Sequence, residues 1–109
     1  MTEANITVTP PSGNKYIYTP YLISSTTFNS VAGNYMFGYK LTNGKWYILY
    51  VGQTEDFSTR FSNHEKLDAS KKDGATHILA HVNGNEKARK DEEKELIGWL
   101  QPKHNEKLK

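Results

Sequence analysis

The chain has 109 residues, with 14 Lys and Arg against 12 Asp and Glu, a formal net charge of +2 and no cysteine. This length supports one domain with a single core, and the absence of cysteine excludes a disulfide framework and a thiolate zinc site. No stretch approaches the roughly 18 apolar residues of a membrane span, and the N-terminus lacks a basic start followed by an apolar run. We therefore expect a cytoplasmic protein without membrane contact. The small net charge means that any contact with a polyanion is local.

The first part of the chain is rich in turn-forming residues. Residues 1–14 favour a turn or an unstructured arm, with Pro10 and Pro11 at its centre. Residues 15–25 are β-prone but contain Pro20, which predicts at best an edge strand or two short extended pieces.

Residues 34–52 contain the clearest local signal. Asn43-Gly44 lies between two β-rich runs and predicts a hairpin with a two-residue turn. This register places Thr42 opposite Lys45, and it puts one set of side chains on one side of the ribbon with a small gap over Gly52. That set comprises Tyr35, Phe37, Tyr39, Trp46, Ile48 and Tyr50.

The rest of the chain predicts two helices and one more strand. Residues 53–67 favour a helix with Thr54 as its N-cap, on which Arg60 and His64 lie four residues apart and share a stripe. Residues 75–82 predict a third strand, and residues 86–100 predict a final helix that stops before Pro102. The expected fold is mixed α+β, with a small three-stranded antiparallel sheet flanked by helices.

An acidic residue interrupts the apolar stripe of the final helix. Leu96, Ile97 and Leu100 follow Glu93 by three, four and seven residues, so all four share one helix face. An unpaired carboxylate in apolar surroundings costs on the order of several kcal/mol. Glu93 therefore lies at the rim of the stripe, has a cationic partner or holds a metal ion.

These features occur in an order that resembles the GIY-YIG nuclease family. The first triplet reads Gly33-Asn34-Tyr35, the second reads Tyr50-Val51-Gly52, and Arg60 follows Gly52 by eight residues. The family's final motif is matched by Glu93, the Leu96-Ile97 pair, Pro102 and Asn105. Asn34 departs from the apolar β-branched residue that the family prefers, and we interpret this as a change in packing rather than in chemistry.

The resemblance covers residues 33–105, which leaves residues 1–32 as an N-terminal extension of unknown role and residues 106–109 as a tail. The extension can cover a sheet edge, pair with a second copy or lengthen the substrate surface. The resemblance implies a GIY-YIG-like fold and an endonuclease that hydrolyses DNA phosphodiester bonds with Mg²⁺ or Mn²⁺.

The resemblance also implies a catalytic site of five residues, which are Tyr35, Tyr50, Arg60, His64 and Glu93. Tyr35 is the candidate general base, which requires nearby positive charge because a free phenol has a pKa near 10. Glu93 is the single carboxylate ligand of the metal, which suffices if water and DNA complete the coordination shell. The guanidinium of Arg60 suits two oxygens of the scissile phosphate. His64 orients the nucleophile or Tyr50, or donates to the phosphate.

Each of these residues also has a structural interpretation. Tyr35 and Tyr50 can be core aromatics of the hairpin, and His64 can be a C-terminal residue of its helix, near the negative end of the dipole. Arg60 can pair with Asp56, and Glu93 with Arg89. Asn105, with Gly33 and Gly52, is expected to be structural.

The alternative function is a nucleic-acid-binding or protein-interaction module that keeps the fold but does not cut. The chain has no evident helix-turn-helix, zinc module or basic arm. We therefore expect DNA recognition with low intrinsic sequence specificity, or a partner protein that supplies specificity. Neither the oligomeric state nor the DNA substrate follows from the sequence.

Overall fold

The computed structural model of the protein describes residues 4–25 and 27–105. The tail expected at residues 106–109 lies outside these ranges. The elements are β1 (Ile6–Val8), β2 (Tyr16–Leu22), a short 3-10 helix η1 (Ile23–Ser25), β3 (Gly33–Lys40), β4 (Trp46–Thr54), α1 (Phe57–Arg60), α2 (Glu65–Lys72), β5 (His77–Val82) and α3 (Glu86–Leu100).

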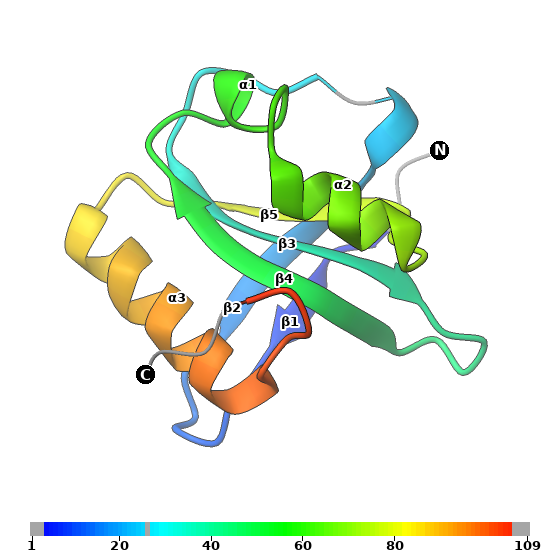
Figure 1. The fold of residues 1–109 in the computed structure, drawn as a ribbon. Coiled ribbons are helices and arrows are strands. Elements are labelled where there is room, and N and C mark those ends of the chain that lie inside the picture. The colour runs from blue at the N-terminus through cyan, green and yellow to red at the C-terminus, as the bar shows by residue number, and fades with distance from the viewer. Residues whose placement is uncertain (1–3, 26, 106–109) are drawn as a thin grey trace.

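The sheet has five strands in the order β1-β2-β5-β3-β4, and every neighbouring pair is antiparallel (Figure 1). The expectation of a three-stranded sheet is therefore wrong, although the mixed α+β character holds. The two additional strands come from residues 1–32, where β2 covers the edge that β5 would otherwise expose. Pro20 is tolerated because β1 pairs only with Tyr16–Tyr18, so β2 has no outer neighbour at Pro20. At that position the missing N–H of proline costs no hydrogen bond between strands.

The β3–β4 hairpin has a longer turn than the sequence predicts. The N–H of Leu41 donates to the carbonyl of Lys45 at 2.7 Å, so residues 42–44 form the turn, with Gly44 at a φ of 87°. A bulge follows, because Phe37 pairs with Tyr50 and Gly38 pairs with Ile48.

Leu49 is the extra residue of this bulge, and it shifts the register by one. Tyr35 opposite Gly52 and Phe37 opposite Tyr50 are therefore confirmed, whereas the pairing near the turn is wrong. Trp46 and Ile48 consequently pack on the other face of the sheet, against the cluster that contains Leu96.

The helix expected over residues 53–67 is two helices. Asp56, not Thr54, caps α1, and its side chain accepts from the N–H of Ser58 at 2.8 Å. The chain leaves helical geometry after Phe61, and His64 becomes the N-cap of α2. Arg60 and His64 therefore lie on different helices. The final helix agrees with its predicted bounds, residues 86–100.

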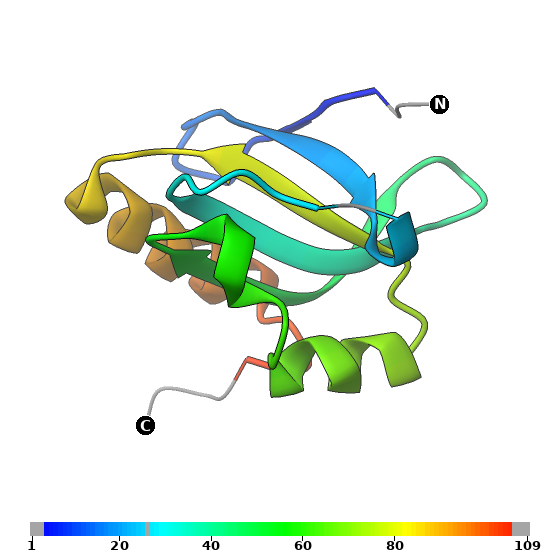
Figure 2. The same ribbon diagram turned by 90° about the horizontal axis from the view of Figure 1, so that it is seen from above.

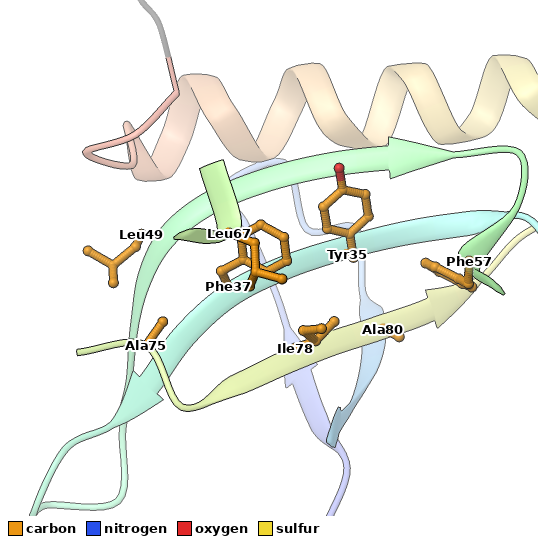
Figure 3. Close-up of a cluster of buried hydrophobic side chains, with 8 residues drawn as sticks. All are labelled: Tyr35, Phe37, Leu49, Phe57, Leu67, Ala75, Ile78 and Ala80. Carbon is orange, nitrogen blue, oxygen red and sulfur yellow. The ribbon is translucent and has the colours of Figure 1, made fainter. Parts of the chain in front are cut away.

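The two faces of the sheet carry separate hydrophobic clusters. In the view from above, the green α1 overlaps the sheet and the yellow-green α2 lies below it in the picture, whereas the yellow-to-orange α3 passes behind β4 (Figure 2). The first cluster joins Tyr35 and Phe37 to Phe57 of α1 and Leu67 of α2 (Figure 3). The second joins Met36 and Val51 to Leu96. Within the described ranges, no helix combines the length and apolar character required to cross a membrane.

Candidate active site

Tyr35 lies across the neighbouring strand because residue 52 is a glycine. A Cβ on Gly52 would lie 2.5 Å from Cζ and 2.6 Å from Oη of Tyr35, so any larger residue would occupy the place of the phenol. Figure 3 shows the Tyr35 hydroxyl directed away from its apolar neighbours and across β4. The gap expected over Gly52 is therefore filled by the Tyr35 ring.

The Tyr35 hydroxyl is hydrogen-bonded to His64, with 2.8 Å between Oη and Nε2. Tyr35 is fully buried and His64 is 4% exposed. The other ring nitrogen, Nδ1, accepts from the N–H of Lys66 at 3.2 Å. Since a neutral imidazole carries one proton, that proton is on Nε2, and His64 donates to the Tyr35 oxygen.

His64 is held in its neutral form. Burial, followed by the positive charge of Arg60, lowers the pKa of its imidazole to about 4. At neutral pH, His64 is therefore a fixed hydrogen-bond donor to Tyr35, not a cation.

Arg60 interacts electrostatically with each of the other predicted site residues. Its guanidinium carbon is 5.9 Å from the centroid of the Tyr35 ring, a cation–π distance. Burial raises the pKa of Tyr35, Tyr50 and Glu93, and the charge of Arg60 lowers each of the three. Together with its effect on His64, Arg60 acts on all four of the other predicted residues.

The two phenols differ in their access to solvent. Tyr35 has no exposed surface, whereas Tyr50 is partly exposed. Burial is the main reason that the pKa of each is raised. Interaction with Tyr35 lowers the pKa of Tyr50, whereas interaction with Tyr50 raises that of Tyr35. The interaction between the two phenols therefore favours the phenolate form at Tyr50, the more accessible of the two.

Glu93 reaches this group from the other side of the sheet. Glu93 is a residue of α3. Burial is the main cause of the raised pKa of Tyr50, and the negative charge of Glu93 raises it further. Because β4 is the outermost strand, groups from both faces of the sheet can meet at its edge. Within the described part of the chain, the half-buried Glu93 carboxylate forms no hydrogen bond or ion pair, and burial raises its pKa.

This carboxylate suits a hard divalent cation. Among the residues that the structure describes, no cluster of three His, Asp or Glu side chains could enclose a metal. A site with one protein ligand is nevertheless typical of Mg²⁺, which keeps several waters and takes further oxygens from a substrate phosphate. An unpaired, half-buried carboxylate beside Arg60 and Tyr50 fits that description.

The remaining motif residues have structural contacts. Asn105 pairs with the outer edge of β4, where Oδ1 accepts from the N–H of Val51 and Nδ2 donates to its carbonyl, each at 2.8 Å. A Cβ on Gly33 would lie 2.2 Å from the carbonyl oxygen of His81 and 2.7 Å from the ring of Phe57, so the start of β3 requires glycine.

The structural interpretations raised for the charged residues are not what the geometry shows. Asp56 caps α1 through Ser58, and within the described ranges it forms no hydrogen bond or ion pair with Arg60. Arg89 donates to Gln53 and to the carbonyl of Asn83, both at 3.1 Å, rather than to Glu93. The two tyrosines do belong to the first hydrophobic cluster, so their packing role and their place in the site coexist.

Two residues outside the sequence-based site set contribute to its surroundings. Asn34, interpreted from the sequence as a packing change, is fully buried and donates from Nδ2 to the carbonyl of Arg89 at 2.9 Å. Glu92, not Glu93, is the fully buried acid of α3. The sequence signal for the role of Asn34 is an amide side chain within an otherwise apolar strand. For Glu92 there is no such signal, because helical spacing alone does not decide which of two adjacent glutamates faces the sheet.

Comparison of the chain with protein-family models, curated proteins and solved structures found no match. A functional conclusion therefore depends on the residues and their geometry.

Substitution of Gly52 by alanine tests the crossing of Tyr35 over β4. We expect Gly52→Ala to destabilise the fold by about 1 to 3 kcal/mol, the usual cost of overpacking, because the Tyr35 ring must move. Gly98→Ala is the matched control, since nothing lies within 4 Å of a Cβ at that helical position. Alanine there should stabilise by about 0.5 to 1 kcal/mol. Chemical denaturation measures both, and equal stabilities for the two variants would contradict the crossing.

The pKa of His64 predicts a specific loss of stability in acid. The folded-state pKa of about 4 lies below the ordinary value of 6.5, so the unfolded chain binds the proton more readily. The contribution of neutral His64 is complete above pH 6.5 and is lost as the pH falls to about 4. It amounts to about 2 to 3 kcal/mol.

His64→Gln removes this titration. We expect the difference in unfolding free energy between the natural chain and the variant to shrink as the pH is lowered from 7 to 4. Denaturant titrations at several pH values measure that difference. A constant difference over this range would show that His64 is not held neutral.

Proposed function

We propose that the protein is a metal-dependent endonuclease that hydrolyses DNA phosphodiester bonds. The observation that carries the proposal is the position of Arg60. Its charge acts on Tyr35, Tyr50, His64 and Glu93, which come from β3, β4, the start of α2 and α3. A cation surrounded by phenols, a neutral histidine and an unpaired carboxylate matches the needs of phosphodiester hydrolysis.

Arg60 binds the scissile phosphate. Its guanidinium stays charged at any relevant pH and donates in a planar fork that matches two phosphate oxygens. As negative charge develops on the phosphate during attack, the fixed cation stabilises it more than it stabilises the ground state.

The phenol pair acts as the general base. Tyr35, the candidate base from the sequence, is buried, so the proton of the attacking water enters at the partly exposed Tyr50 oxygen. The charge of Arg60 and the interaction with Tyr35 each lower the pKa of Tyr50, and His64 Nε2–H donates to the Tyr35 oxygen. Because burial raises the pKa of both phenols, the phenolate is a minor species at neutral pH, and the rate of cleavage should rise with pH.

Glu93 would hold Mg²⁺ or Mn²⁺. When bound, such an ion supplies Lewis-acid stabilisation of charge on the phosphate and the departing oxygen. The charge of Arg60 keeps Glu93 more ionised than burial alone would, which favours an anionic ligand at neutral pH.

The substrate is DNA, bound with low intrinsic sequence specificity. The modest net charge of +2 supports a small contact surface rather than an extended one. A partner protein that supplies specificity remains part of the proposal.

Loss of the Glu93 carboxylate should abolish cleavage. We expect Glu93→Gln to cut plasmid, branched and single-stranded DNA roughly 100-fold more slowly or worse with Mg²⁺ or Mn²⁺, the usual size of losing one key electrostatic contact. Asp91→Asn on the same helix is the control, because Asp91 is exposed and, among the described residues, its carboxylate pairs with Lys87. It should leave the rate unchanged.

DNA binding, measured by gel shift, separates the possible outcomes of this experiment. Binding retained by Glu93→Gln without cleavage supports a catalytic carboxylate. If the natural chain binds DNA but cuts none of the substrates with either metal, the non-cleaving module is the correct alternative. Equal rates for Glu93→Gln and the natural chain would exclude Glu93 from catalysis.

A further inference from the structure

A layer of buried polar groups connects α3 to the sheet one turn before Glu93. On the sheet, Gln53 and His81 are the cross-strand neighbours of Asn34. Above them lie Arg89 and Glu92 of α3, which are 3% and 2% exposed. Apolar side chains would be expected at such positions, since charged residues are almost never fully buried unless they are paired.

Each side of the layer is bonded to a different strand. On the β4 side, Arg89 Nε donates to Gln53 Oε1 at 3.1 Å. On the β5 and β2 side, one oxygen of Glu92 is bonded to His81 Nδ1 at 2.9 Å and accepts from the Tyr18 hydroxyl at 2.5 Å. The helix is therefore held against three strands by directional bonds, which fix its rotation more tightly than apolar contacts do.

Asn34 binds the backbone of the helix at the centre of the layer. In an α-helix the N–H of residue 93 donates to the carbonyl of residue 89. The Nδ2 of Asn34 donates to this same carbonyl at 2.9 Å, so it is a second donor at the base of the turn that carries Glu93.

Asn34 makes this contact at a cost to the fold. Its Oδ1 is one of two buried side-chain atoms without a hydrogen-bond partner in the described ranges, the other being Ser70 Oγ. Leaving a buried polar atom unpaired disfavours the folded state, and an apolar side chain of the same shape can be neutral or stabilising there. A buried, half-satisfied amide is therefore not explained by stability.

We infer that Asn34, with Gln53 as its neighbour, is a positioning residue for the carboxylate of Glu93. Residues 89 and 92 face the sheet, and residue 93 lies about 100° further around the helix than residue 92. A layer that fixes the rotation of the helix at residues 89 and 92 therefore also fixes the direction in which Glu93 points. This inference rests on the proposed metal-dependent function.

Mn²⁺ alone, titrated into the ¹⁵N-labelled full chain, tests the role without any cleavage. Paramagnetic broadening of the amide signals next to residue 93 reports the ion, and Glu93→Gln supplies the blank. We expect Asn34→Leu, which keeps the shape of the side chain, to need about 10- to 100-fold more Mn²⁺, as expected when an outer partner of a ligand is lost. Its unfolding midpoint should equal or exceed that of the natural chain.

Two further variants complete the comparison. Ser70→Ala removes the other unpaired buried atom, far in sequence from the layer, and should leave the Mn²⁺ response unchanged. Gln53→Met removes the hydrogen-bond partner of Arg89. Because Gln53 is partly exposed, this variant tests the role of the layer in positioning Glu93 even if Asn34→Leu does not fold. It should also require more Mn²⁺.

The outcomes separate the inference from the proposed function. A Mn²⁺ response that depends on Glu93 but is the same in the natural chain, Asn34→Leu and Gln53→Met overturns the positioning role and leaves the metal site intact. If the natural chain and Glu93→Gln broaden alike, the metal assignment itself fails, and the positioning role fails with it.

Discussion

The contact on which the site depends is the crossing of the Tyr35 ring over Gly52. Strand neighbours on one face normally lie side by side, but the missing side chain at residue 52 lets the phenol extend across the outermost strand. There its hydroxyl meets His64, which can donate only because the break between α1 and α2 turns it into a helix cap. The absence of a Cβ at Gly52 and the break between α1 and α2 together fix the position of the Tyr35 phenol.

The crossing also explains how residues from opposite faces of the sheet combine. Tyr35, Tyr50, Arg60 and His64 belong to the side covered by α1 and α2, whereas Glu93 comes from α3. They come from the two sides of β4, an edge strand of the sheet, and Asn105 pairs with part of its free edge. The charge of Arg60 then acts on every member, so the protonation states of the site are set jointly.

Sequence patterns within a short stretch predict those features of the fold that depend on neighbouring residues alone. The hairpin and the final helix follow from turn residues and spacing, whereas the predicted pairing of Tyr35 with Gly52 holds because the bulge at Leu49 offsets the extra residue in the turn. The sequence predicts too few strands because Pro20 argues against a strand at residues 15–25. The structure shows that Pro20 is tolerated because β1 is short and does not pair with β2 there. The bulge at Leu49 and the choice between Glu92 and Glu93 depend on packing between distant segments, which no single stretch of sequence records.

Titration of the site with and without Arg60 shows whether this guanidinium sets the pKa values of its neighbours. In the natural chain and in Arg60→Gln, NMR of the tyrosine ring carbons and the histidine ring measures the pKa values of Tyr50 and His64. If the guanidinium unites the site, its removal raises both pKa values, because the cation favours phenolate and disfavours imidazolium. Lys45→Gln in the exposed hairpin turn should change neither. Unchanged pKa values in Arg60→Gln would contradict a site organised around this charge.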